Sequence, residues 1–417
     1  MMPEPGIPRD DALRGAEGLT GAPGARAVGS FLESRGWRVT AARPVQALYR
    51  PGREALVRYR VEARGPDGAR RVLIMCAEVR ARRNDLSPAP DWLAERFGIA
   101  DPVGREGPYL VWAFPYDPTL SALPAAADGG SVRPLLGRRA PAAVSVQALR
   151  YRPRRRAVFR YRVVGGRRAA EVLYGKVLRE RKLRRAREVM EEVRSRRVRL
   201  ATGVEAEGLL LAPALPGRSL RDLLLCGDPL PSAERVAGLL GALETGGAAS
   251  RPDPAAEAWA TVSLIERIAP EAAGDAARVA ERVERGAASG ATGIRTVHGD
   301  LYENQVLVDD DFSLGLVDLD DVGPGELAMD AANFSAHLLA LAMAVPSAAR
   351  RLIAYRAILR PVLAARAGLD ERRLGPREGL AMLKLSTGPF RVLEACWPAA
   401  LGRRVEVALR LSTGGGW

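Results

Sequence analysis

The stretch from Thr296 to Asp330 reads TVHGDLYENQVLVDDDFSLGLVDLDDVGPGELAMD. It holds two short apolar runs, 306–308 and 314–317, on either side of three consecutive aspartates. Apolar runs joined by a polar turn predict a β-hairpin. Because such a hairpin returns the chain, it can bring the carboxylates that stand before and after it, Asp300 and Asp318, to the same place.

The polar side chains of this stretch follow the order of a catalytic loop for phosphoryl transfer. A protein kinase loop has the form H-R-D-x-x-x-x-N, in which the aspartate takes the substrate proton and the asparagine holds magnesium. Here the first part is His298-Gly299-Asp300, and Gln305 lies five residues after Asp300. Asp318 ends the second strand, where a kinase has its metal-binding aspartate. We expect Asp300 to be the catalytic base, and Gln305 and Asp318 to bind Mg²⁺ beside the phosphates of ATP.

The stretch resembles the aminoglycoside phosphotransferase and choline kinase family, whose pattern is roughly HGDLxxxN, then I-D-W/F, then G-D-P-x-x-D-L-A. The resemblance covers residues from about 144 to 417. It implies that Asp330 supports the catalytic loop rather than reacting. The family usually has asparagine where this chain has Gln305, and maltokinase-like and glucosamine-kinase-like members share the glutamine. Asn304 is the alternative metal ligand if the loop is shifted by one residue.

Other polar groups in the stretch have simpler interpretations. An HGD triplet alone is a weak signal, and an aspartate-rich turn is usually a solvated turn. The combination of the triplet, the amide, the hairpin and the GPGELAMD tail carries the kinase interpretation. We expect His298 to hold the loop by hydrogen bonding, and Asp320 and Asp321 to be surface or supporting groups rather than metal ligands.

An internal repeat occupies the first half of the chain. Residues 45–61 read VQALYRPGREALVRYRV and residues 146–163 read VQALRYRPRRRAVFRYRV. With Arg150 treated as an insertion, 13 of 17 aligned positions are identical. Each copy alternates as a half-buried strand does, turns at a proline, and runs into a further apolar strand, 73–79 or 171–177.

The two copies differ at one charged position. Lys176 lies on the third strand of the second copy, where kinases bind the α- and β-phosphates with a lysine. The first copy has Glu78 there, and a carboxylate would repel triphosphate, so we expect only the second copy to bind ATP. Glu191 is the expected ion-pair partner of Lys176, with Glu188 and Glu192 as alternatives.

The turn of the second copy carries Arg154, Arg155 and Arg156 where a kinase has a glycine-rich loop. Guanidinium groups could clamp phosphate oxygens, and a solvated turn is an equally good interpretation. Residues 209–220, LLLAPALPGRSL, resemble the hinge of the family, where backbone groups meet the adenine.

These features predict an α+β chain, with a two-lobed protein-kinase-like fold and an additional N-terminal α/β cap. We expect the cap, with its degenerate N-lobe-like repeat, over residues 1–143. A β-rich ATP-binding N-lobe is expected over 144–215, and a helical catalytic C-lobe over 216–417.

Composition indicates the compartment. The three cysteines are far apart and form no CxxC pair, which suits a reducing cytoplasm. No apolar export signal opens the sequence, and the longest apolar run, Leu338 to Val345, is too short to span a bilayer. We expect a cytoplasmic protein with no membrane partner.

The net charge of +14 favours anionic partners in general. Only three of the 63 basic residues are lysine, and the arginines spread along the whole chain, so we expect no specific nucleic-acid partner. Steeply salt-dependent binding to nucleic acid would show the opposite. The sequence leaves the oligomeric state open.

The acceptor is expected to be a hydroxylated small molecule. Residues after Asp330 hold five acidic and 13 basic side chains, a poor lining for a polycationic aminoglycoside. A sugar, amino sugar or related metabolite fits better. An aminoglycoside-type antibiotic phosphotransferase stays open, and so does a pseudokinase that binds nucleotide without transfer, which Gln305 favours.

Overall fold

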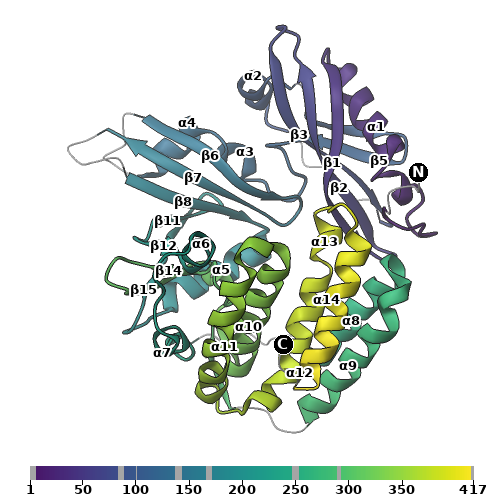
Figure 1. Cartoon of the computed structure of the whole chain (residues 1–417). Coiled ribbons are helices and arrows are strands. Elements are labelled where there is room, and N and C mark those ends of the chain that lie inside the picture. The colour runs from purple at the N-terminus through teal and green to yellow at the C-terminus, as the bar shows by residue number, and fades with distance from the viewer. Residues whose placement is uncertain are drawn as a thin grey trace. The chain divides into compact units, whose positions relative to one another are not determined.

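The computed structural model describes residues 6–82, 89–99, 101–136, 143–165, 171–246, 253–288 and 293–414 (Figure 1). They form two compact units. The first comprises the chain up to Leu183 together with residues 205–211 and 389–398. The second comprises residues 184–204, 212–388 and the chain from Ala399 onward.

The first unit opens with a five-stranded sheet of strand order β1-β2-β3-β5-β4. All four neighbouring pairs of this sheet are antiparallel. Its strands are β1 (Arg38–Arg50), β2 (Glu54–Arg64), β3 (Arg70–Arg80), β4 (Val103–Glu106) and β5 (Tyr109–Ala113). Helices α1 (Ala22–Glu33) and α2 (Trp92–Phe97) accompany it, and α1 contacts β1, β3, β4 and β5.

A second five-stranded sheet in the same unit has the order β10-β11-β8-β7-β6, which is the first order read from the other edge. Its strands are β6 (Ala143–Arg152), β7 (Arg156–Val164), β8 (Glu171–Leu178), β10 (Val204–Ala206) and β11 (Leu209–Pro213). The repeat therefore extends two strands beyond the segment in which the sequences match. The extra residue of the second copy coincides with a register shift between Ala148 and Arg150.

The strand register confirms that Glu78 and Lys176 are equivalent. Leu56 and Val158 occupy aligned positions in the repeat, and they lie opposite Glu78 and Lys176 respectively. Because side chains alternate across a strand, Glu78 shares a face of its sheet with Leu56.

The two sheets share one apolar core. It contains Leu56 and Trp112 from the first sheet and Tyr151, Phe159 and Tyr161 from the second. Short helices α3 (Leu123–Ala126) and α4 (Gly129–Val132) contribute to the same core. Since Phe159 points to the core, the alternation of strand β7 and its partner β8 turns Lys176 to the opposite face of the second sheet.

The second unit is mainly helical (Figure 1). Its helices are α5 (Glu180–Glu192, which begins in the first unit), α6 (Leu220–Cys226), α7 (Ala233–Ala237), α8 (Pro254–Ile268), α9 (Ala273–Ala288), α10 (Leu327–Ala344), α11 (Ala349–Arg366), α12 (Glu371–Ser386) and α14 (Trp397–Ser412); α13 (Gly388–Arg391) lies at the border of the units. Side chains cap several N-termini, as where Asp253 accepts from the backbone N–H groups of Ala255 and Ala256.

Short strands position the loop of this unit that contains Asp300. The sheet β12-β14-β15-β9 and the pair β13-β16 are built from β9 (Arg199–Leu200), β12 (Arg218–Ser219), β13 (Ile294–Val297), β14 (Val306–Val308), β15 (Leu314–Leu316) and β16 (Gly323–Glu326). Strands β14 and β15 are the hairpin predicted from the sequence, with Val306 opposite Leu316. Arg199 donates to the Asp309 carboxylate at its turn, at 2.9 Å.

Helix α10 is longer than the apolar run that the sequence suggested. Among the described residues it is the one helix whose length and composition would allow it to cross a membrane, with a mean hydropathy of 1.3 over Leu327–Ala344. Two thirds of that window, 67%, is buried inside the protein, and α10 packs against α11 and α12. The central helix of a globular core passes the same test of length and composition, and α10 is a buried core helix of this kind.

A buried ionic cluster joins these three helices. Glu378 on α12 is 0% exposed and accepts from Arg356 and Arg360 of α11, at 2.9 and 2.8 Å. Ser335 of α10 donates to the same carboxylate at 2.5 Å. A charge in this position is stable only while its partners stay in place.

We predict that Glu378→Ala lowers the free energy of unfolding by about 3 to 5 kcal/mol, because it leaves the buried Arg356 guanidinium without a carboxylate and removes one of the two carboxylates that pair with Arg360. Glu257→Ala is the control. It removes the partner of Lys384 from an exposed pair of 2.8 Å, and should cost less than about 1 kcal/mol. Urea unfolding of both variants measures the difference, and equal effects would contradict a structural role for the cluster.

Candidate active site

The backbone before Asp300 is fixed by one carboxylate. Asp330, in the first turn of α10, accepts from the backbone N–H of His298 at 2.7 Å and of Gly299 at 2.8 Å. Gly299 has a φ of 86°, a conformation that glycine adopts without steric cost. The predicted supporting role of Asp330 is confirmed by these bonds.

His298 ties the loop to the hairpin. Its side chain is 2% exposed, and its Nε2 lies 3.0 Å from the carbonyl oxygen of Val317. The backbone N–H of Val317 in turn donates to the carbonyl of Gln305 at 3.1 Å. The expected hydrogen-bonding role of His298 is therefore confirmed, and the loop that carries Asp300 has little freedom to move relative to β15.

The amide and the carboxylate expected to share a metal are neighbours. The Nε2 of Gln305 donates to Oδ2 of Asp318 at 3.1 Å, and Gln305 is 4% exposed. Asp318 has φ 62° and ψ 51°, a left-handed conformation that few residues other than glycine adopt. Such strain persists at functional sites because the surrounding structure over-determines it. Asn304, the alternative ligand, is exposed.

This donor set suits Mg²⁺. The described residues contain no group of three or more His, Cys, Asp or Glu side chains that could hold a metal alone. Magnesium instead keeps several waters and is bound through one or two protein groups plus substrate phosphates. One carboxylate and one amide, those of Asp318 and Gln305, fit that requirement.

The structure decides between the two positions expected for Asp320. It is fully buried, at 0% exposed, which excludes the surface and leaves a supporting position. Asp321 is half-buried. Both lie in the short 3-10 helix Leu319–Asp321 that turns the chain into β16.

Sequence reasoning missed Glu303, which lies three residues after Asp300 within the loop. Its side chain is 1% exposed, and burial, reinforced by the charge of Asp300, raises its pKa to about 7, while Arg221 acts in the opposite direction. The backbone carbonyl of Glu303 accepts from Arg221 N–H at 3.2 Å. A carboxyl beside the expected base is visible in HGDLYENQ, but its burial is not.

We predict that Glu303→Gln flattens the pH dependence of stability. A carboxyl whose pKa rises from 4.5 to about 7 on folding stabilises the fold fully below pH 4.5 and loses that contribution as the pH rises through 7. The wild type should therefore lose up to about 3 kcal/mol between pH 5 and 8 that the variant keeps.

Denaturant unfolding of both proteins at pH 5 and pH 8 measures this difference. Asp310→Asn, at an exposed residue of the hairpin turn, is the control and should follow the wild type. Identical pH profiles for wild type and Glu303→Gln would show that Glu303 does not titrate in this range.

The residues expected to bind ATP belong to different units. Lys176 is half-buried on β8 in the first unit. Glu191 is on α5 in the second unit, with its side chain 67% exposed and 3.9 Å from Arg187. Of the alternatives, Glu188 is exposed and Glu192 accepts from Thr245 at 3.4 Å. Which glutamate pairs with Lys176 stays a prediction.

The arginines of the β6–β7 turn are not equivalent. Arg154 is 1% exposed and pairs with Glu78 of the first copy at 2.5 Å, so neither a clamp on the phosphates of ATP nor a solvated turn describes it. Burial, together with the charges of Arg150, Arg156 and other arginines, lowers the pKa of Arg152 to about 9. Like charges gathered in this way are stabilised by an anion.

The sequence profile of the phosphotransferase enzyme family (APH) matches residues 152–399. No curated protein matches the sequence. Among the solved structures that are similar to it are an aminoglycoside phosphotransferase and two choline kinases. A thermostable mutant of aminoglycoside phosphotransferase APH(4)-Ia is 14% identical with a TM-score of 0.45, over 64% of this chain and 95% of that one.

Choline kinase from Cryptosporidium parvum Iowa II is 11% identical with a TM-score of 0.41, over 64% of this chain and 88% of that one. Choline kinase LicA from Streptococcus pneumoniae is 14% identical with a TM-score of 0.43, over 67% and 96%.

The loop and the family match together define a class, the kinases that phosphorylate an alcohol group of a small molecule. The profile covers more than half of the sequence, and the chain belongs to the phosphotransferase enzyme family. The fold class expected from the sequence, α+β and protein-kinase-like with an N-terminal α/β cap, is confirmed.

Proposed function

We propose that the protein transfers the γ-phosphate of ATP to a hydroxyl of a small molecule, with Asp300 as the catalytic base. The observation that carries this proposal is the pairing of Gln305 with Asp318 next to a loop that Asp330 fixes. Phosphoryl transfer needs positioned groups and neutralised charge more than covalent help. Asp300 follows the fixed turn, where it would orient the acceptor hydroxyl and take its proton.

Mg²⁺ would be held by Asp318 and Gln305 and would neutralise charge on the phosphates. A side-chain amide has one oxygen and one nitrogen. Since the nitrogen of Gln305 donates to Asp318, the geometry leaves the oxygen as the group with which Gln305 would bind a cation. Glutamine in place of asparagine is therefore compatible with turnover, which weakens the pseudokinase alternative.

Lys176 would bind the α- and β-phosphates, with Glu191 as its partner. Only the second copy of the repeat is proposed to bind ATP. In that copy the face that carries Lys176 is the one turned away from the shared core. In the first copy the face that carries Glu78 contributes Leu56, Leu110 and Trp112 to that core, which supports an ATP site in the second copy alone.

A sugar, amino sugar or related metabolite is the proposed acceptor. Two of the 13 basic side chains after Asp330, Arg356 and Arg360, are buried with Glu378, and the remainder still outnumber the acidic ones. A polycationic aminoglycoside would meet repulsion from such a surface. An uncharged or singly charged polyol would not.

The division into a cap over 1–143, an ATP lobe over 144–215 and a catalytic lobe over 216–417 is part of the proposal, as are a cytoplasmic location and a requirement for ATP and Mg²⁺. These three parts are defined by their expected roles, so their bounds need not coincide with those of the two compact units. The shared core of the two sheets is compatible with a cap that supports the ATP lobe.

We predict that an ATP-consumption screen over sugars, amino sugars, aminoglycosides and amino alcohols finds an acceptor, and that Asp300→Asn then lowers kcat by at least about 100-fold. ATP binding should be nearly intact in this variant, because the nucleotide is held by other groups. Retention of more than half of the wild-type rate would remove Asp300 as the base. ATP binding with no transfer to any acceptor would favour the pseudokinase.

We also predict that Lys176→Ala weakens ATP binding by about tenfold or more, the loss expected for one charge-assisted hydrogen bond. The sequence offers a matched control, since Lys384 is also a lysine but pairs with Glu257 on the helical unit. Lys384→Ala should leave ATP affinity unchanged in calorimetric titrations with Mg²⁺. Equal affinities in the two variants would remove Lys176 from the nucleotide site.

A further inference from the structure

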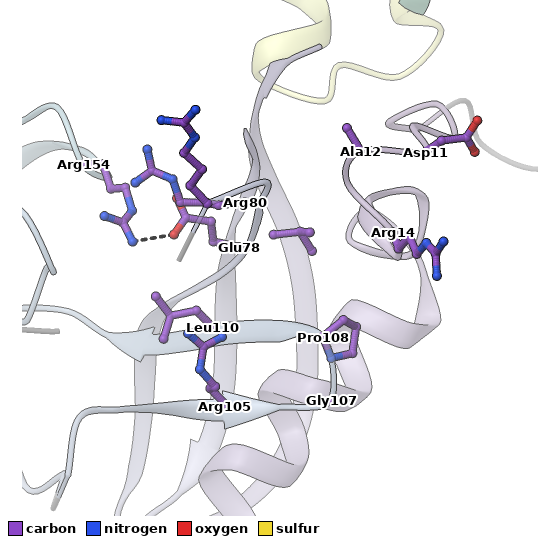
Figure 2. A pocket seen from close by; sticks show the side chains of 12 residues that line it. Asp11, Ala12, Arg14, Glu78, Arg80, Arg105, Gly107, Pro108, Leu110 and Arg154 are labelled. Carbon is purple, nitrogen blue, oxygen red and sulfur yellow. Dashed lines mark hydrogen bonds and ion pairs between the residues drawn. The ribbon is translucent and has the colours of Figure 1, made fainter. Parts of the chain in front are cut away.

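A cavity of about 330 Å³ lies against the first sheet. Strand β3, the β4–β5 hairpin and the N-terminal segment line it together with Arg154 from the β6–β7 turn (Figure 2). Its lining is strongly basic: five arginines, among them Arg80, Arg105 and Arg154, face two acidic residues, Asp11 and Glu78. An excess of three positive charges around one small cavity favours an anionic ligand.

A buried ion pair forms the inner end of the cavity. Arg154 and Glu78 are each 1% exposed, and Nη2 of Arg154 lies 2.5 Å from Oε2 of Glu78. Figure 2 shows the Glu78 carboxylate turned toward the Arg154 guanidinium, with Arg80 and Arg105 nearby. The Arg154 side chain also lies over the ring of Trp112, 5.4 Å from its centroid.

This pair leaves hydrogen-bonding capacity unused. Within the part of the chain that the structure describes, Nε and Nη1 of Arg154 and Oε1 of Glu78 are buried without a hydrogen-bond partner. Nε of Arg80 lies 3.8 Å from Oε1, which is too long for a hydrogen bond. Buried donors and acceptors of this kind are costly unless something satisfies them. The ion pair between the two side chains satisfies only Nη2 of Arg154 and Oε2 of Glu78.

The conformation of Arg154 is costly as well. It has a φ of 58°, and the first copy of the repeat has glycine at the aligned position, Gly52, with a φ of 67°. Asp117 holds this turn by accepting from the backbone N–H of Arg154 at 2.7 Å and from the hydroxyl of Tyr151 at 2.7 Å. An arginine stands where glycine would be less strained, and such strain is typical of positions where the side chain has a function.

The walls of the cavity are preformed. Asp10, in the N-terminal segment, accepts from Tyr49 Oη at 2.9 Å and from the backbone N–H of Gly52 at 2.8 Å. Tyr109, at the start of β5, donates to the carbonyl of Gly15 at 3.1 Å. A ligand would therefore enter a fixed site and not have to order a loose segment.

We propose that this cavity binds a small phosphate monoester that also carries a hydroxyl group. The dianionic phosphate would lie among Arg80, Arg105 and Arg154, since several guanidinium groups match phosphate oxygens in geometry and charge. The hydroxyl would donate to Oε1 of Glu78. Glu78 is equivalent to Lys176, so the two copies place charged groups of opposite sign at the same strand position. This site is separate from the proposed nucleotide site, and neither depends on the other.

Calorimetric titration of the full-length protein with glycerol 3-phosphate, at low ionic strength and without nucleotide, tests the proposal. Arg105→Ala should weaken binding by at least about tenfold, and Arg105 is exposed, so its loss does not threaten folding. Arg43→Ala is the matched control, an exposed arginine of the same sheet outside the cavity lining, and should bind as the wild type does. Glycerol, which lacks the anion, should not bind.

Lys176→Ala separates this site from the nucleotide site and should leave glycerol 3-phosphate binding unchanged. Arg154→Gln gives a second measurement from the inner end of the cavity, and should weaken binding at least as much as Arg105→Ala. The proposal is overturned if the wild type does not bind, if Arg105→Ala binds as tightly as Arg43→Ala, or if Lys176→Ala alone abolishes binding.

Discussion

The carboxylate of Asp330 is the constraint on which the site depends. It accepts two backbone N–H groups at the turn before Asp300, and it projects from the first turn of a helix that forms the centre of the second unit. Bonds from backbone to an ionised acceptor are short and strong, and here they fix the loop that carries Asp300 to a buried helix. The position of Asp300 therefore depends on α10, and the position of α10 depends on the ionic cluster around Glu378. Helix α10 thus contributes both to the stability of the second unit and to the position of the expected catalytic base.

The sequence predicted this part of the fold well because its signals are local. The hairpin between Asp300 and Asp318 follows from two apolar runs and a turn, and the role of Asp330 follows from a motif of fixed spacing. What the sequence could not supply was burial. Asp320 and Glu303 stand in polar runs, and only the tertiary fold decides that both lie inside. The pairing of Arg154 with Glu78, 76 positions apart, is likewise invisible to any local pattern.

The repeat shows how two nearly identical segments come to differ. Both copies fold into the same order of five strands, so their shared residues specify the sheet and not its use. The copies differ at the turn and on the third strand: the first has Gly52 and Glu78, and the second has Arg154 and Lys176 at the aligned positions. Packing also separates the two copies, because the turn of the second copy lies against the face of the first copy that carries Glu78.

The common core of the two sheets bears on how the chain can be divided. The family profile begins at residue 152, inside β6, yet Tyr151, Phe159 and Tyr161 bury their rings against Trp112 and its neighbours from the first copy. A fragment cut at the family boundary would present this aromatic face to water, and exposed apolar patches of that kind lead to association. The segment that resembles its relatives is therefore smaller than the segment that folds. In this protein the boundary of the family match and the boundary of the segment that folds fall at different residues.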